Sequence, residues 1–177
     1  MILLGLAAGK RSTPLDDWFE KFDHRIGWTL AILAKPPLLA VIAIAVIAVA
    51  LRRRWRRFAA VAVAFPPAAY LVVLLIKPLF GRMKGDDGLA YPSGHITVTT
   101  VVVGLVVLVT GGAVWSVFVA VAYIAIAMLG VGTTFHYFTD TVGGVLLGTS
   151  VVCLAALVAR PDLTRVNPGA THVTADG

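Results

Sequence analysis

The chain has 177 residues, of which 59% are apolar and only 14% are charged, and its mean hydropathy is +0.90. A soluble domain of this size carries far more charge on its surface, so this composition excludes an ordinary water-soluble protein. The apolar residues come in long runs, which predict an all-α bundle of membrane helices. The formal net charge of +6 is concentrated in 52-RRRWRR-57, which beside apolar spans indicates the cytoplasmic face of a membrane protein and argues against nucleic-acid binding.

Two segments precede the first predicted span. Residues 1–9 are apolar but too short to cross a bilayer, which takes about 20 residues, and they lack the features of a signal peptide. We interpret them as a short hydrophobic stub that inserts partly or belongs to a truncated helix. Residues 10–28 mix charged with aromatic side chains, and the spacing of Trp18, Phe19 and Phe22 predicts a short amphipathic helix at the membrane interface.

Five apolar runs predict transmembrane helices, with approximate limits 29–51, 58–76, 96–110, 113–135 and 138–159. The third run is rich in β-branched residues, which favour a strand in isolation. An open strand edge cannot face lipid, however, so we expect a helix there as well.

Prolines and glycines mark the predicted breaks in this succession of spans. Lys35-Pro36-Pro37 interrupts the first run near its start, Pro66-Pro67 predicts a kink in the second, and Gly111-Gly112 predicts a tight turn. We expect residues 1–160 to form a single integral-membrane domain and residues 161–177 to form a polar, disordered tail.

The arginine cluster orients the predicted bundle in the cell membrane. With residues 52–57 in the cytoplasm, counting crossings places residues 77–95 and 136–140 on the extracytoplasmic side and the C-terminal tail in the cytoplasm. One membrane face then carries Lys77, Arg82, Lys84, His95, His136 and Asp140. Three cations in a short external loop run against the usual charge bias, so we expect them to bind an anion, although a solvated loop is the alternative.

The segment 136-HYFTD-140 combines a histidine and a carboxylate, a pair of side chains that can provide a nucleophile. On a helix, His136 and Asp140 lie four residues apart on one face. A carboxylate that accepts from one imidazole nitrogen fixes the tautomer and leaves a lone pair on the other nitrogen, ready for attack. A structural His–Asp pair at the interface is the alternative, because this spacing alone is a weak signal.

The segment 92-PSGH-95 precedes an apolar run and predicts a helix start, with Ser93 as the N-cap. The first turn of such a helix leaves unpaired N–H groups that suit a phosphate, and His95 can protonate a leaving oxygen. With Lys77, Arg82 and Lys84 to neutralise charge, the pattern predicts phosphoryl transfer without a metal or other cofactor. Asp86 and Asp87 are adjacent and would not easily converge on a metal ion.

These residues resemble the type 2 phosphatidic acid phosphatase (PAP2) superfamily of membrane lipid phosphatases and phosphotransferases. Its three motifs match 77-KPLFGRMK-84, 92-PSGH-95 and 136-HYFTD-140, and the likeness extends from Lys77 to about Gly148. The resemblance implies a six-helix bundle with its site at one membrane face. It also implies a role for each motif residue. Lys77 would bind phosphate, Ser93 and Gly94 would donate hydrogen bonds to it, His95 would protonate the leaving group, His136 would form a phosphohistidine, and Asp140 would orient His136.

The chain departs from the family pattern at two arginines. Lys84, followed by Gly85, stands where the first motif has an arginine, and Arg82 comes two residues earlier as a possible substitute. Gly130 stands where the family has an arginine six positions before the reactive histidine. We therefore expect Arg82 or Lys84 to compensate for the missing cation, or the substrate to differ.

Three functions fit the pattern. The leading one is hydrolysis of a lipid phosphate or diphosphate, such as a polyprenyl phosphate or a phosphatidic-acid-like lipid. The second is a phosphotransferase that passes the phosphoryl or phospho-headgroup to an alcohol. The third is a non-catalytic membrane protein that binds anionic lipid. The spacing Gly144-x-x-x-Gly148 allows a homo-oligomer, but packing within one bundle is the simpler use.

Overall fold

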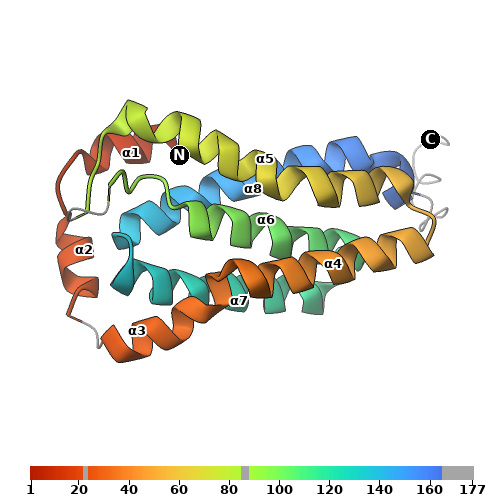
Figure 1. Ribbon diagram of the computed structural model, residues 1–177, viewed down its shortest axis with the longest axis horizontal. Helices are drawn as coiled ribbons and strands as arrows, with labels where there is room; N and C mark the ends of the chain where they lie inside the picture. The colour runs from red at the N-terminus through yellow and green to blue at the C-terminus, as the bar shows by residue number, and fades with distance from the viewer. Residues whose placement is uncertain (22–23, 85–87, 165–177) are drawn as a thin grey trace, which may run out of the picture.

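The computed structural model describes residues 1–21, 24–84 and 88–164, which form the elongated helical bundle of Figure 1. The elements are α1 (Ile2–Ala8), α2 (Pro14–Phe19), α3 (His24–Leu30), the 3-10 helix η1 (Ala31–Ala34), α4 (Pro36–Arg52), α5 (Arg56–Phe80), α6 (Gly94–Val109), α7 (Val114–Thr134) and α8 (Phe138–Leu163). Within the described ranges there is no β-strand, only an isolated bridge between Met83 and Leu89. The predicted all-α class is therefore confirmed.

Four helical segments are long and apolar enough to cross a membrane. They are Arg25–Arg52, Arg56–Phe80, Val114–Thr134 and Phe138–Leu163. The fifth apolar helix, α6, has 16 residues, which at 1.5 Å per residue span about 24 Å and fall short of a hydrocarbon core of about 30 Å. These helices indicate a multi-pass integral membrane protein. Of the five predicted spans, four are helices long and apolar enough to cross a membrane.

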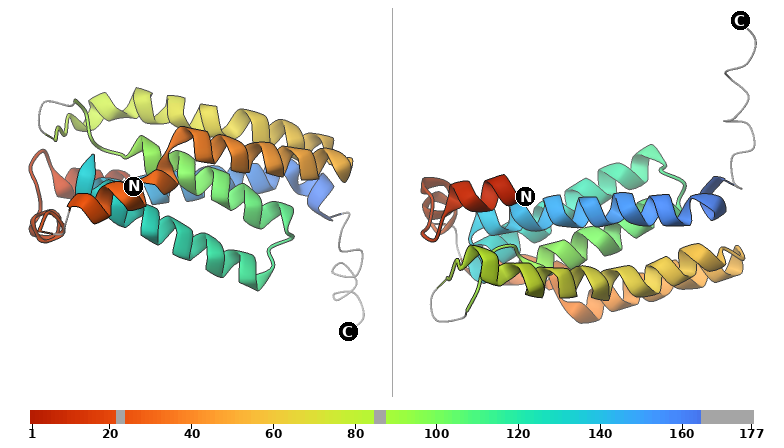
Figure 2. Two further views of the ribbon diagram at one scale, coloured as in Figure 1. Left: turned by 60° about the horizontal axis from the view of Figure 1, so that its bottom comes forward. Right: turned by 90° about the horizontal axis from the view of Figure 1, so that it is seen from above.

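Helix α6 lies at the centre of the bundle, packed against α4, α5, α7 and α8 (Figures 1 and 2). Most of its apolar and threonine side chains are buried, as expected for a helix that is apolar on every face and covered by neighbouring helices. Gly144 and Gly148 of α8 face it. A Cβ atom at Gly144 would lie 2.8 Å from the carbonyl oxygen of Ser93, and one at Gly148 would lie 2.6 Å from Cβ of Thr100. The small-residue spacing therefore serves packing within the bundle.

The helix ends follow the predicted proline and glycine signals. Lys35 is extended, and α4 begins directly after it with Pro36 in its first turn, where a missing N–H costs nothing. Gly111 and Gly112 have φ angles of 75° and 71°, a conformation that residues with a Cβ rarely adopt, and they form the turn between α6 and α7. Helix α5 continues through Pro66 and Pro67 without ending.

The arginine cluster of residues 52–57 includes the turn between α4 and α5, here called the arginine turn. This turn and the polar loop before α6 lie at opposite ends of the bundle (Figure 1). At the arginine end, the buried carboxylate of Asp162 accepts from the backbone N–H groups of Arg57 at 2.9 Å and Phe58 at 3.0 Å, and so caps α5. This contact corrects the predicted domain limit, because residues 161–163 continue α8 and do not belong to a polar tail. Residues 165–177 of the predicted tail lie outside the described residues.

Residues 10–28 do not form one amphipathic helix, because the segment divides into α2 and α3, and Phe22 lies outside the described residues. Helix α2 begins at Pro14 with a capping box, in which the Thr13 N–H donates to Asp16 Oδ2 at 2.9 Å and the Asp16 N–H donates to Thr13 Oγ1 at 3.3 Å. Phe19 is buried and stacks on Phe138 at 3.8 Å between ring centroids, so α2 covers the amino end of α8.

The apolar stub forms α1, which packs against α8 (Figure 2). Gly5 lies against the rings of Phe80 and Tyr91. The Tyr91 hydroxyl donates to the carbonyl oxygen of Met1 at 2.6 Å. Burial, together with the charge of Asp140, raises the pKa of Tyr91 to about 12, so the phenol stays protonated and keeps this hydrogen bond at physiological pH.

Candidate active site

An apolar pocket of about 640 Å³ lies between α4, α5 and α6. Its polar side chains are Tyr70, Lys77, His95 and His136. The rest of its lining consists of Ala34, Pro36, Leu39, Ala40, Ala43, Pro66, Pro67, Gly94, Val98 and Val102. A pocket with this lining suits a ligand that has one polar end and an apolar remainder.

Four of the predicted site residues line this pocket, Gly94 among them, and the other three meet there from separate elements. Lys77 comes from the last turn of α5, His95 from the first turn of α6, and His136 from the turn before α8. The two imidazole rings lie 6.0 Å apart between centroids. The His95 ring also stacks on Phe135 at 5.6 Å, which limits its orientation. Lys77 Nζ donates to the carbonyl oxygen of Leu89 at 2.6 Å.

The amino end of α6 lines the pocket through Gly94 and His95. The predicted N-cap is confirmed, since Ser93 Oγ accepts from the Ile96 N–H, although at a long 3.5 Å. The Ser93 side chain is fully buried and does not line the pocket. The N–H groups of the first helical turn have no partner within the helix, and they add positive potential beside Lys77.

His136 and Asp140 are close, but they do not share a helix face, the arrangement that they would have if the segment were helical throughout. His136 lies in the turn before α8, and Asp140 lies in the first turn of that helix. His136 Nδ1 lies 3.8 Å from Asp140 Oδ2, which is beyond hydrogen-bond distance. This nitrogen is buried and makes no hydrogen bond. Asp140 Oδ2 accepts instead from the Tyr137 N–H at 3.0 Å. The carboxylate thus faces Nδ1, and Nε2 is the ring nitrogen on the opposite side.

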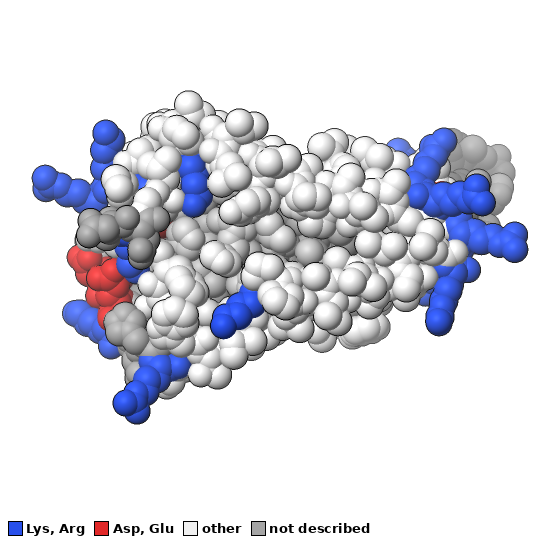
Figure 3. All heavy atoms as spheres, in the orientation of Figure 1, with Lys and Arg blue, Asp and Glu red and all other residues white. Residues whose placement is uncertain are grey.

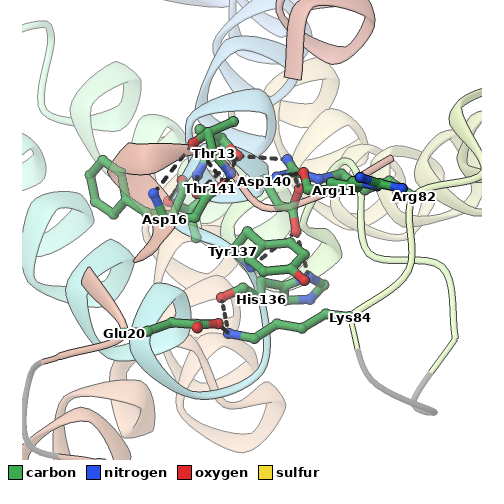
Figure 4. A network of polar contacts seen from close by, with 12 residues as sticks. Arg11, Thr13, Asp16, Glu20, Arg82, Lys84, His136, Tyr137, Asp140 and Thr141 are labelled. Carbon is green, nitrogen blue, oxygen red and sulfur yellow. Dashed lines mark hydrogen bonds and ion pairs between the residues drawn. The ribbon is translucent and has the colours of Figure 1, made fainter. Parts of the chain in front are cut away.

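Arg82 is the centre of a buried ion network beneath this turn (Figure 4). Its Nη2 contacts Asp16 Oδ2 at 2.7 Å, and its Nη1 contacts Asp140 Oδ1 at 2.8 Å. It also donates to Thr139 Oγ1 at 2.6 Å and to the Arg11 carbonyl at 3.0 Å. Arg82, which the sequence analysis predicts to bind phosphate, has a side chain that is 0% exposed and does not line the pocket. It holds Asp140 in place instead.

Asp16 is a site residue that the sequence analysis missed. Its carboxylate accepts from the Thr139 backbone N–H at 2.9 Å, which caps α8 from a segment far away in the chain. Burial by itself raises the pKa of Asp16. Hydrogen bonds from Thr139, Thr13 and Arg82 outweigh that effect, so the pKa lies below its ordinary value of 3.8. In the sequence, Asp16 gives only a local signal, that of a capping box after Thr13.

Lys84 supports the turn that carries His136. Its Nζ donates to the His136 carbonyl at 2.9 Å and pairs with Glu20 Oε1 at 3.3 Å. It also lies 5.0 Å from the centre of the Tyr137 ring. Lys84 therefore contacts the backbone of His136. It does not line the pocket, although the sequence analysis predicts that it binds phosphate.

Gly130, which stands in place of an expected arginine, has no room for any side chain. A Cβ atom there would overlap the backbone of Leu30 and Ala31. The 3-10 helix η1 packs directly on α7 at this point, with Ala31 and Ala34 buried. The close contact between η1 and α7 therefore leaves no space for an arginine side chain at position 130. Neither Arg82 nor Lys84 supplies a substitute cation inside the pocket.

The pocket brings together a histidine with a free ring nitrogen, a second histidine, one lysine and a helix amino end. Among the described residues, no three His, Cys, Asp or Glu side chains gather as a metal-binding group, while Asp86 and Asp87 lie outside those residues. Comparisons with protein-family models, with curated proteins and with solved structures found no match.

Proposed function

We propose that the protein is a membrane lipid phosphatase of the PAP2 type, which hydrolyses a lipid phosphate through a phosphohistidine. The observation that carries the proposal is the meeting of Lys77, His95 and His136 at one end of an apolar pocket. The polar end suits a phosphate, and the apolar lining suits the beginning of a lipid chain.

The reaction proceeds in two balanced steps. His136 Nε2 attacks phosphorus, the ester P–O bond breaks, and protonated His95 gives its proton to the departing alcohol oxygen. Water then attacks phosphorus while neutral His95 accepts its proton, and the P–N bond breaks to release phosphate and restore His136. Lys77 and the first-turn N–H groups of α6 stabilise the negative charge on the phosphoryl oxygens in both transition states.

The residues outside the pocket serve to hold the nucleophile. Asp140 faces Nδ1 of His136 and stabilises positive charge on the ring as the P–N bond forms. Arg82 fixes Asp140, and Lys84 fixes the His136 backbone. These contacts let a histidine in a turn keep one position relative to His95.

The proposal places the site on the extracytoplasmic side of the cell membrane. The pocket's polar end and the arginine turn lie at opposite ends of the bundle, and the positive-inside rule assigns that turn to the cytoplasm. Figure 3 shows most lysine and arginine side chains at the two ends, and the acidic side chains visible in that view lie at the end that carries α2.

Phosphate release from lipid phosphates tests the proposal. The purified protein is assayed in detergent micelles with dioleoyl phosphatidic acid and with farnesyl phosphate, with and without EDTA. We expect release that resists EDTA and is lost in His136→Ala. The control is Ser150→Ala, an exposed position farther along α8, which keeps full activity. Release that persists in His136→Ala, or no release from any lipid phosphate, would contradict the proposal.

A further inference from the structure

The pocket contains a single fixed cation. Among the lysines and arginines of residues 1–21, 24–84 and 88–164, only Lys77 lines it. Arg82 is engaged by Asp16 and Asp140. Gly130 cannot be replaced by an arginine without displacing η1.

The two cations that lie next to His136 on the side away from the pocket are paired with carboxylates (Figure 4). Among the described residues, Arg82 pairs with Asp16 and Asp140, and Lys84 pairs with Glu20. The Glu20 side chain is 43% exposed, so it faces solvent beside the turn. Arg82 and Lys84 therefore offer no unpaired positive charge to a second anionic group of a ligand.

The opposite direction, deeper into the pocket, is apolar. Beyond His95 the lining consists of Val98 and Val102 of α6, with Pro66 and Pro67 facing them from α5. Tyr70 supplies a phenol there but no charge. An anionic group in this part of the pocket would lose its hydration without gaining a cation, which is strongly unfavourable.

We propose that the site takes lipid monophosphates and discriminates against lipid diphosphates, a specificity that rests on the proposed phosphatase function. A phosphate monoester carries about −1.5 to −2 charges at pH 7, which Lys77 and the α6 amino end offset, while the His95 ring supplies a hydrogen bond. A diphosphate adds further charge. If its terminal phosphorus is attacked, the inner phosphate lies against the apolar wall. If the inner phosphorus is attacked, the terminal phosphate is the leaving group and lies beside His95 with no second fixed cation.

A pair of substrates with one chain tests this directly. Farnesyl phosphate and farnesyl diphosphate differ only in the second phosphate, so the ratio of their kcat/KM values reports the discrimination. We expect the monophosphate to be preferred at least tenfold. Equal values, or a preference for the diphosphate, would overturn the proposal while leaving the phosphatase function intact.

Charge variants on α2 identify the cause. Glu20→Gln removes one carboxylate from the network and releases Lys84, so the preference for monophosphate should fall at least threefold. Asp17→Asn is the matched control, because Asp17 is an exposed acid of α2, the helix that Glu20 follows as C-cap, and lies outside the network; it should leave the ratio unchanged. Equal effects of the two variants would contradict the assignment to local charge.

A binding measurement separates this inference from the phosphatase proposal. If neither lipid is hydrolysed, the phosphatase function fails, and the binding of the same two lipids is measured by calorimetry in micelles. Tighter binding of farnesyl phosphate, weakened in Lys77→Gln, would still support the charge argument. Binding of the diphosphate that is as tight or tighter, or binding of neither lipid, would overturn it.

Discussion

Replacing Arg82 by glutamine tests whether the buried network supports the site. The side chain is 0% exposed and makes ion-pair contacts with two carboxylates at 2.7 and 2.8 Å. Glutamine keeps some hydrogen-bonding capacity but removes the cation that joins Asp16 and Asp140, which leaves two buried carboxylates without this partner. Removing one partner of a buried ion pair costs about 3–5 kcal/mol of stability. We expect a loss in that range, measured by denaturant unfolding in detergent.

The same variant separates a supporting role from phosphate binding. Because Arg82 does not line the pocket, the affinity for inorganic phosphate, measured as an inhibition constant, should change less than twofold in folded Arg82→Gln, while kcat falls. Arg82→Lys should restore part of kcat, since it keeps one cation near Asp140. The variant Lys77→Gln should show the converse and weaken phosphate binding. A stability loss under about 1 kcal/mol, or weakened phosphate binding in both variants, would refute the reasoning.

Two further predictions concern the elements around the site. The pKa of Asp16 lies below its ordinary value of 3.8 in the folded chain, so its ionisation stabilises the fold fully above that pH, and the contribution is lost as the pH falls through the folded value. The stability difference between the wild type and Asp16→Asn should therefore shrink in acid, and a difference that grows as the pH falls would contradict this. Gly130→Ala should cost about 1–3 kcal/mol, because its methyl group overlaps the Ala31 backbone. Gly132→Ala, where a Cβ lies 3.2 Å from Phe138 Cα, is the milder control, and an equal cost for both would argue against the close contact with η1.

The helices could be predicted because their positions and ends depend on residues that are close together in the sequence. Long apolar runs must form helices in lipid, Pro36 fits a first helical turn, and Gly111 and Gly112 adopt positive φ angles. The cap at Ser93 follows from the same local rules. The meeting of Lys77, His95 and His136 followed from counting crossings, since antiparallel helices bring alternate loops to one end.

The contacts that support the site depend on pairs distant in the chain, which no local pattern reveals. Asp16 caps α8 through Thr139, and Asp162 caps α5 through Arg57 and Phe58. The role of Arg82 could not be predicted for the same reason, because its buried position depends on Asp16.

The predicted start of the last span at residue 138 is confirmed, whereas the spacing of His136 and Asp140 alone does not show where the helix begins. Residues 136 and 140 are compatible with one helical face, yet α8 starts at Phe138, after His136. Asp140 is then an acidic residue in the first turn that accepts from the Tyr137 N–H, a common use of an acid at that place.

The central claim is that His136 carries the phosphoryl group, and trapping that intermediate tests it most directly. The protein is mixed with ³²P-labelled farnesyl phosphate, quenched in alkali, where phosphohistidine survives, and digested for mass spectrometry. We expect label on the peptide that contains His136, and none in His136→Ala. His95→Asn should also form less labelled enzyme, because the alcohol then leaves without a proton. Turnover without label on His136, or label on another residue, would contradict the account.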